Sequence, residues 1–346
     1  MSPDRLQDLP PQWAHALLGV ERFVTQELGI DPGGKHILVG LSGGPDSTAL
    51  LLFCRLFQNR WQSTISAGHL DHRLRPESGQ EADHVRRLCA EFNIECSCEE
   101  ADVAAHARQQ GTGLEETART LRYEFLERTR KAYSADYLFT GHTLNDLAEE
   151  IVLRLLRGTG WPALSGMPAV DPKRSLVRPF LLTPKKTLTG FLRAINVSWT
   201  EDPSNLEPLF RRNRIRLDVV PRLEEENPLF LSAVARLWQQ GARDSGYWQE
   251  QLRRLAPSEM TTARGVLLPE GVLAGEHPAL RIRWYKKALD SLGPGQVRTQ
   301  GLENLEQAFV KQSTGTIIQF PGNKRATLVR EGILFSPDPA VHREPE

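Results

Sequence analysis

Long apolar runs and cysteines are both scarce in this sequence of 346 residues. No apolar stretch approaches the ~20 residues that cross a bilayer, so we expect no membrane-spanning segment. The amino-terminal stretch is acidic and contains prolines, and it does not resemble a secretion signal. The 4 cysteines are too few for a disulfide framework in a chain of this length, which indicates a reducing, cytoplasmic compartment.

Clusters of metal ligands are also lacking. Cys96 and Cys98 are spaced more closely than the usual C-x2-C, and no second pair completes four ligands. His69 and His72 form an H-x-x-H pair without a suitably spaced third ligand. We therefore expect no zinc site, and we interpret the two cysteines as free thiols on a partly buried strand.

The sequence has no net charge, because 43 basic side chains balance 43 acidic ones, and this argues against a general nucleic-acid binder. The distribution is uneven, however. Residues 1–172 carry 17 basic and 24 acidic side chains, residues 173–222 carry 11 and 4, and residues 223–346 carry 15 of each. The basic band at 173–222 is either a contact surface for a polyanion or a solvated surface neutralised by acidic groups nearby.

Residues 42–47, SGGPDS, follow an apolar run at 37–41 and precede a leucine-rich stretch at 48–57. This order predicts a strand, a glycine-rich loop and a helix, whose N-terminus and backbone N–H groups can bind phosphate. The loop lacks the lysine of a Walker A motif and the G-x-G-x-x-G of a dinucleotide site. Asp46 suits an anion loop if Mg²⁺ lies between it and the phosphates; the alternative is a Gly-Pro turn in which Asp46 or Ser47 caps the helix.

Predicted strands alternate with predicted helices in the first half of the chain. We expect strands at 37–41, 63–69, 93–98 and 137–140, and helices at 12–30, 48–57, 78–93, 101–110, 114–133 and 143–157. Such alternation predicts an α/β fold with a doubly wound parallel sheet, whose ligands bind beyond the carboxyl ends of the strands. We expect an N-terminal helix (1–33) packed on a catalytic domain (34–222), and then a smaller, mostly helical C-terminal domain (223–346).

Charged side chains are frequent near these strand ends. The stretch 69–78, HLDHRLRPES, follows the second strand, and its Arg73 and Arg75 lie either near phosphate or in a charged surface turn. Arg119 and Arg122 are three residues apart on one helix face, which suits phosphate binding or ordinary ion pairs within the helix.

His142 follows the fourth strand, and Asp146 and Glu149 lie on the first turns of the next helix. Acidic residues are favourable at a helix start for dipole reasons alone, but this pair could also hold an ammonium group or Mg²⁺. A basic helix follows later in the chain. It is either solvated or dense enough to track a polyanion backbone, and its members are Arg211, Arg212, Arg214 and Arg216.

The order of these motifs resembles the tRNA(Ile)-lysidine synthase family, within the PP-loop ATP pyrophosphatases. The resemblance covers about residues 35–223 and is carried by SGGPDS, HLDHRLRPES, ARTLRY, TGHTLNDLAEE, RPFLLTPK, WTEDPSN and RRNRIR; it is weaker after 223. The chain departs from the family at 145–150, where NDLAEE replaces DDQAET. Asp146 and Glu149 are kept, whereas Asn145 removes one negative charge.

The resemblance implies an ATP-dependent ligase that attaches free L-lysine to C2 of the wobble cytidine in the CAU anticodon of tRNA(Ile). The base is first adenylated with release of pyrophosphate, and AMP departs when lysine attacks. The resemblance further implies a cytoplasmic enzyme with ATP as co-substrate, Mg²⁺ as cofactor, and tRNA(Ile) and lysine as partners. The oligomeric state stays open, a homodimer included.

The same resemblance implies roles for individual residues. Asp46, Arg122, His142 and Asp146 would be catalytic, and Asp46 would also hold Mg²⁺. Lysine would be bound by Asp146 and Glu149. ATP would be bound by Ser42, Gly43, Gly44, Pro45, Asp46, Ser47, Arg119 and Arg122, and tRNA by Arg211, Arg212, Arg214, Arg216 and the C-terminal domain.

Two other functions stay open. A PP-loop tRNA thiolase would share the nucleotide site but needs sulfur-handling cysteines or iron–sulfur ligands, for which Cys96 and Cys98 are poorly spaced. A non-catalytic, nucleotide-responsive RNA-binding protein would bind ATP and tRNA without releasing pyrophosphate.

Overall fold

The computed structural model describes residues 5–73, 78–200, 210–253 and 261–338, and the chain divides into two compact units, 1–242 and 243–346. The division lies within the long helix α10 (Phe230–Arg253), beyond the position near 222 expected from the sequence. The first half of α10 belongs to the first unit because Val234 and Trp238 are buried in one core with Leu147 and Met167.

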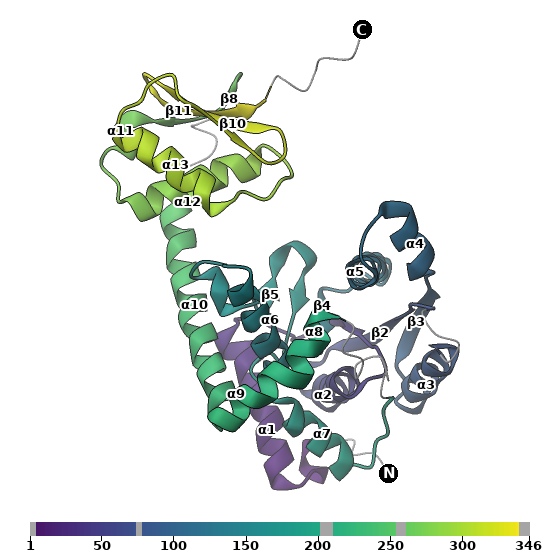
Figure 1. The fold of residues 1–346 in the computed structure, drawn as a ribbon. Helices are drawn as coiled ribbons and strands as arrows, with labels where there is room; N and C mark the ends of the chain where they lie inside the picture. Colours follow the sequence, from purple (N-terminus) through teal and green to yellow (C-terminus); the bar gives the residue numbers. More distant parts are fainter. Residues whose placement is uncertain (1–4, 74–77, 201–209, 254–260, 339–346) are drawn as a thin grey trace. The chain divides into compact units, whose positions relative to one another are not determined.

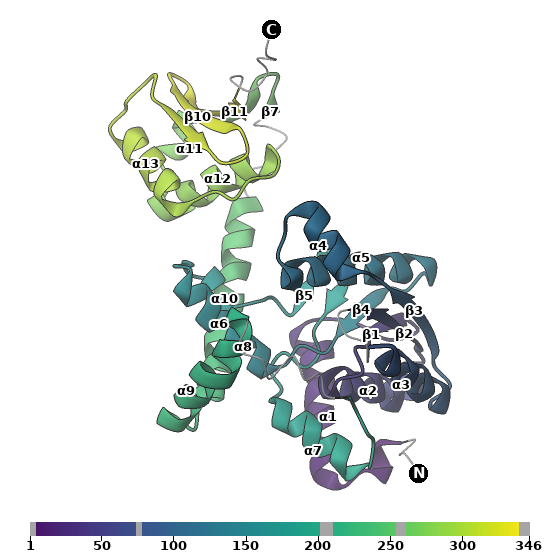
Figure 2. The same ribbon diagram turned by 45° about the vertical axis from the view of Figure 1, so that its right-hand side comes forward.

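The first unit is built on a six-stranded sheet with the order β3-β2-β1-β4-β6-β5 (Figures 1 and 2). All strands except β5 run parallel to their neighbours. The strands are β1 (His36–Gly40), β2 (Thr64–Asp71), β3 (Glu95–Glu100), β4 (Tyr137–Thr140), β5 (Val170–Asp171) and β6 (Leu176–Val177). The predicted α/β fold is confirmed, with a sheet that is mostly parallel rather than wholly so.

Helices cover both faces of this sheet (Figure 2). Successive side chains of β1 point to opposite faces, and both sets are apolar, so each face must be buried by helices. Ile37 and Val39 share a core with α1, α2, α3 and α7, whereas Leu38 is buried with residues of α5. The helices on the first face are α1 (Pro11–Arg22), α2 (Pro45–Trp61), α3 (Ser78–Glu91) and α7 (Lys185–Ala194). The second face has α5 (Leu114–Ala132), on which α4 (Val103–Gln110) packs.

The remaining helical segments of this unit connect or extend these layers. They are α6 (Leu144–Leu156), the turns Leu6–Asp8, Phe23–Glu27, Ala163–Ser165 and Pro172–Arg174, and the run α8 (Arg211–Arg214), Ile215–Val219 and α9 (Val220–Glu226). None of the helices in the described ranges is both long and apolar enough to cross a membrane. The parallel strands end at one edge of the sheet, so the loops that follow them meet there.

The second unit contains a five-stranded antiparallel sheet with the order β7-β8-β11-β10-β9. Its strands are β7 (Thr261–Thr262), β8 (Gly265–Pro269), β9 (Ile317–Phe320), β10 (Lys324–Val329) and β11 (Gly332–Pro337), and its helices are α11 (Glu270–Leu273), α12 (Pro278–Ser291) and α13 (Thr299–Val310). The expectation of a mostly helical C-terminal domain is therefore wrong. Strands β10 and β11 form a hairpin, and β11 pairs on its other side with β8, which is distant in the sequence.

Candidate active site

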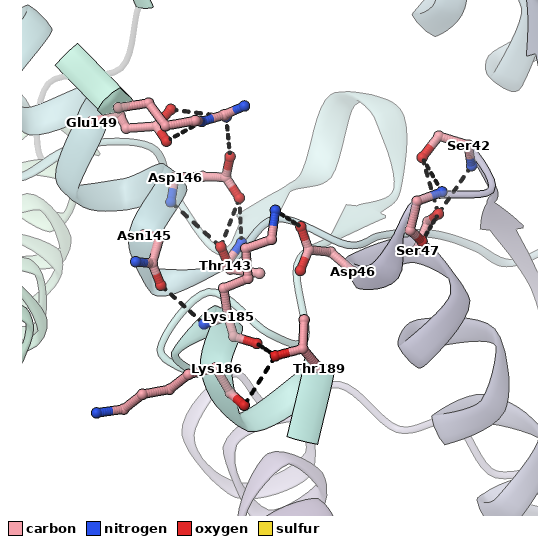
Figure 3. Close-up of polar contacts among 12 residues, drawn as sticks. Ser42, Asp46, Ser47, Thr143, Asn145, Asp146, Glu149, Lys185, Lys186 and Thr189 are labelled. Atoms are coloured by element: carbon pink, nitrogen blue, oxygen red, sulfur yellow. Dashed lines mark hydrogen bonds and ion pairs between the residues drawn. The ribbon is translucent and has the colours of Figure 1, made fainter. Parts of the chain in front are cut away.

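The loop between β1 and α2 is held by its own side chains and by a distant segment. Ser42 N–H donates to Ser47 Oγ at 3.1 Å, and the two hydroxyl oxygens lie 3.0 Å apart (Figure 3). Thr200 N–H donates to the Gly43 carbonyl at 2.9 Å. Gly43 has a φ of +83°, and a Cβ there would lie 2.8 Å from Thr200 Oγ1, so glycine is required. The loop leads into the N-terminus of α2, whose first N–H groups have no intrahelical acceptor.

The loop between β4 and α6 lies directly against this first turn of α2. A Cβ on Gly141 would lie 2.9 Å from the backbone C and O atoms of Asp46, and 3.0 Å from Ser47 N. Since real Cβ atoms do not come so close to a backbone, a glycine at 141 permits the approach. His142, the next residue, is thereby placed beside the loop at 42–47.

Asp46 lies on the first turn of α2 with one carboxylate oxygen engaged and one not. Its Oδ2 is 3.5 Å from Lys185 Nζ, whereas its buried Oδ1 hydrogen-bonds to no described residue (Figure 3). Burial raises the pKa of Asp46 to about 6, although Lys185 opposes the shift. A buried, unpartnered carboxylate oxygen beside an anion loop suits a Mg²⁺ ion, which typically takes one or two carboxylates and completes its shell with phosphates and water.

The Asp146–Glu149 pair on α6 is neutralised by two arginines. Arg212 Nε donates to Glu149 Oε2 at 2.9 Å, and Arg216 Nε donates to Glu149 Oε1 at 2.7 Å. Both guanidinium groups also donate from Nη2 to Asp146 Oδ1, at 3.4 Å for Arg212 and 3.5 Å for Arg216. Glu149 is only 3% exposed, so this contact is shielded from solvent. The carboxylates predicted to hold an ammonium group thus already hold two cations.

The four arginines predicted to bind tRNA consequently divide into two pairs. Arg212 and Arg216, four residues apart, point toward α6, whereas Arg211 and Arg214 are exposed. The exposed pair lies on a face that a polyanion can reach. The inward pair is bound to the very carboxylates predicted to take lysine.

Asp146 is oriented by the residue that caps α6. Thr143 donates to Asp146 Oδ2 from its hydroxyl at 2.8 Å and from its N–H at 2.9 Å. Burial alone would raise the pKa of Asp146, but His142, Arg212 and the Thr143 N–H lower it below its usual range. Asp146 is therefore a charged, rigidly held carboxylate.

His142 is partly buried and lies near three positive charges. Its Nδ1 lies 3.0 Å from Thr140 Oγ1. Burial, followed by the charges of Arg178, Arg122 and Arg119, lowers the pKa of His142 to about 3, against an opposing effect of Asp146. The imidazole is neutral near pH 7, so it can form hydrogen bonds but holds a proton poorly.

Arg119 and Arg122 both lie over the ring of Tyr123 on α5, with guanidinium carbons 5.0 and 5.7 Å from its centroid. Arg174 lies 5.0 Å from the same centroid. Within the described ranges no carboxylate forms an ion pair with Arg119 or Arg122. Neither charge is therefore neutralised by a described carboxylate, and an anionic ligand could supply that partner.

Sequence reasoning did not single out Thr143 and Lys185. The spacing of Thr143 and Asp146, three residues apart at the start of a helix, was the available signal for a capping box. For Lys185 the signal was a pair of lysines at a helix start, where the helix dipole disfavours positive charge.

Other sequence candidates do not enter the contacts described above. Arg75 and residues 201–205 fall outside the described residues. Arg73 is exposed, and its Nε lies 3.4 Å from Glu100 Oε2. His69 contacts the Leu41 carbonyl through Nδ1 at 2.9 Å. In the part of the chain that the structure describes, no three His, Cys, Asp or Glu side chains group as metal ligands. Cys96 and Cys98 lie side by side on β3, with sulfur atoms 3.6 Å apart.

Comparison with known proteins relates this geometry to a family. The model of the PP-loop domain matches residues 20–223. A tRNA(Ile)-lysidine synthase from Nitratidesulfovibrio vulgaris is 40% identical over 327 residues, covering 90% of this chain and 94% of that protein. Its counterpart from Thermotoga maritima is 40% identical over 205 residues, covering 59% of this chain and 49% of that protein.

A solved structure supports the fold of the first unit. The U34-tRNA thiolase NcsA from Methanococcus maripaludis superposes with a TM-score of 0.56 over 66% of this chain and 79% of that chain, at 15% identity. At this identity the likeness establishes the fold alone. Because the domain model covers the whole site described above and the Nitratidesulfovibrio relative is matched over nearly its full length, this chain belongs to the tRNA(Ile)-lysidine synthase family of PP-loop proteins.

Proposed function

We propose that the protein ligates free L-lysine to C2 of the wobble cytidine in the CAU anticodon of tRNA(Ile), with ATP converted to AMP and pyrophosphate. The observation that carries this proposal is the position of two acidic features at one edge of the sheet. Asp46, whose Oδ1 has no described partner, lies at the end of the β1–α2 loop. The second feature is the pair Asp146 and Glu149, and Asp146 is close enough to raise the pKa of Asp46. The names of the relatives support the same activity.

The first step activates the base. The cytidine C2 oxygen attacks the α-phosphorus of ATP, and the bond to pyrophosphate breaks. Backbone N–H groups of residues 42–47 stabilise the departing pyrophosphate, and Asp46 holds Mg²⁺, which neutralises phosphate charge when bound. Arg119 and Arg122 neutralise further negative charge in this step, because neither is committed to a described carboxylate.

The second step uses the acidic pair. The lysine ammonium group binds Asp146 and Glu149 and loses a proton to Glu149 or to water, because the lowered pKa of Asp146 makes it a poor acceptor; the amine nitrogen then attacks C2 while AMP leaves. Since Arg212 and Arg216 neutralise this pair, lysine must displace at least one guanidinium group. A displaced arginine is then free to bind an RNA phosphate, which reconciles the lysine-binding and tRNA-binding roles predicted for neighbouring residues.

His142 serves in this mechanism by orientation. Its low pKa makes it a poor proton carrier near pH 7, whereas a neutral imidazole next to Thr140 and Asp146 can hydrogen-bond the base or the incoming amine. The exposed Arg211 and Arg214, together with the C-terminal domain, contact the tRNA backbone. Single-stranded anticodon bases are accessible to such a site.

One assay tests the activity. The protein is incubated with CAU-anticodon tRNA(Ile), ATP, Mg²⁺ and labelled lysine, and the label in the tRNA is counted. We expect label only when ATP is present, and none when uridine replaces the wobble cytidine. Absence of label with the correct tRNA would refute the proposed reaction. Sulfur incorporation in place of lysine would support the thiolase alternative, and ATP and tRNA binding without pyrophosphate release would support a non-catalytic protein.

A further inference from the structure

We propose that Lys185 is an additional ATP-binding residue, whose ammonium group binds the departing pyrophosphate and replaces the lysine that the β1–α2 loop lacks. This inference rests on the proposed function, since it concerns the nucleotide of that reaction. Lys185 comes from α7, far from the loop in sequence.

The position of the Lys185 side chain is the first observation. Its Nζ lies 3.5 Å from Asp46 Oδ2, on the first turn of the helix that follows the loop (Figure 3). The side chain is 45% exposed and that of Asp46 is 22% exposed, so the contact lies at the mouth of the site rather than within a closed core. A phosphate bound at the loop would therefore be within reach of this ammonium group.

The backbone of Lys185 is anchored, which limits where its ammonium group can go. Its N–H donates to Asn145 Oδ1 at 2.9 Å, and Leu144 N–H donates to the Thr183 carbonyl at 3.0 Å. These two bonds join the start of α7 to the start of α6, and Figure 3 shows the first of them. Asn145 thereby positions Lys185 with a neutral amide oxygen, so its departure from the family's aspartate leaves this role intact.

The electrostatics of the site favour an anion next to Lys185. A cation at a helix N-terminus is disfavoured by the helix dipole, and Lys185 occupies that position in α7. Asp46 offsets this cost in the free protein. Once Asp46 is committed to Mg²⁺, Lys185 needs another anion, and a pyrophosphate oxygen supplies a charge-assisted hydrogen bond.

The carboxylate of Asp46 also creates a need for a positive charge next to the bound phosphates. A carboxylate inside a phosphate loop repels phosphates, and residues 42–47 contain no positive charge to compensate. Walker A loops supply this charge from their own lysine. Here the tertiary structure brings the ammonium group of Lys185 to the equivalent task from another helix.

The test compares Lys185→Met with Lys185→Arg and with Lys186→Met. Lys186 is the exposed neighbour whose side chain points away from Asp46 in Figure 3, so K186M removes the same charge from the same turn. Inhibition by pyrophosphate and by AMP is measured for each variant, together with KM for ATP and for lysine. Thermal unfolding checks that each variant is folded.

We expect K185M to raise both KM for ATP and Ki for pyrophosphate by about tenfold or more, the size expected for one lost hydrogen bond to a charged group. Inhibition by AMP and KM for lysine should stay as in the unmodified protein. K185R should retain most of the pyrophosphate affinity, and K186M all of it. This pattern would not arise if Lys185 merely stabilised α7.

Two results would overturn the inference. An unchanged Ki for pyrophosphate in K185M would show that Lys185 only neutralises Asp46. A selective fall in KM for lysine would show that Lys185 occupies the substrate lysine's subsite instead. Calorimetric binding of pyrophosphate and of Mg·ATP repeats the comparison without turnover, so failure of the ligase assay would leave this test decisive.

Discussion

The negative charge of Asp46 conflicts with its burial in the free protein. Its place on the first turn of α2 puts a carboxylate within an anion loop, and its burial raises its pKa from an ordinary value of 3.8 to about 6. The folded state therefore bears a cost for the charged form above pH 6. Under the proposed function, binding of Mg²⁺ and phosphate would remove that cost.

Asp46→Asn should increase stability while abolishing pyrophosphate release. Because the folded-state pKa is raised, stability falls as pH rises from about 4 to 6, and the full cost persists at pH 7.5. Asparagine lacks this charge, so we expect the free energy of unfolding to rise by roughly 1–3 kcal/mol at pH 7.5 and by little near pH 4. Urea unfolding at both pH values measures the difference.

Asp136→Asn is the matched control for D46N. The pKa of Asp136 is lowered, chiefly by the backbone N–H of His36 and then by Lys35, so its charge stabilises the fold above pH 4. D136N should therefore lose stability at pH 7.5, in the opposite direction to D46N. If D46N were less stable than the unmodified protein at pH 7.5, this would contradict the stability cost attributed to the charge of Asp46.

At the scale of elements, the run that begins with α8 has two faces with different surroundings. Helical periodicity turns Arg212 and Arg216 toward the acidic pair on α6, and leaves Arg211 and Arg214 at the surface. In the proposed mechanism, one basic segment therefore both closes the proposed lysine site and contacts RNA. Its charge count alone does not reveal this division, because the two pairs have different neighbours.

Arg211→Gln and Arg212→Gln should separate these faces. R211Q should leave thermal stability unchanged but weaken tRNA binding, and reduce the slope of log Kd against log salt by about 1 for a lost phosphate contact. R212Q removes one of two cations from the buried Glu149, so we expect a loss of about 1–3 kcal/mol in stability as well. Filter binding between low and moderate salt, and thermal unfolding, measure both. An unchanged salt slope in R211Q would exclude a phosphate contact.

At the scale of the whole molecule, the two units have separate cores. In the second unit, the nearly inaccessible Lys324 donates from Nζ to three backbone carbonyls, those of Leu289, Gly293 and Gly295, at 2.9–3.2 Å. This ammonium group joins β10 to the end of α12 and the loop that follows. It acts within the second unit, so its loss should leave the nucleotide site unchanged.

Lys324→Met should therefore destabilise the second unit selectively. Loss of the ammonium group leaves the buried Leu289 carbonyl and the partly buried carbonyls of Gly293 and Gly295 short of a donor, and we expect a cost of roughly 1–3 kcal/mol in that unit. Calorimetry should show one lowered transition, with Kd for Mg·ATP unchanged and tRNA binding weakened, as the proposed C-terminal role requires. Lys286→Met, an exposed lysine on α12, is the control. Equal losses of ATP and tRNA binding would contradict independent units.

Local patterns in the sequence determined the α/β order, the loop at 42–47 and the positions of most helices in the first unit. The reason is that strand alternation, helical periodicity and glycine-rich turns act over a few residues. The same patterns brought Asp146 and Glu149 to the first turns of one helix. They were less informative for β8, which pairs with the distant strand β11, and the five-stranded sheet of the second unit was not predicted.

The tertiary structure alone decided which charges meet. It placed Arg212 and Arg216 on Asp146 and Glu149, and Lys185 beside Asp46, from segments far away in the chain. It also left Asp46 Oδ1 buried without a described partner. Coulomb interactions and burial depend on distance through space, which no local pattern encodes. The sequence by itself determined the nucleotide loop and its family, whereas packing decided which cations neutralise the acidic residues around it.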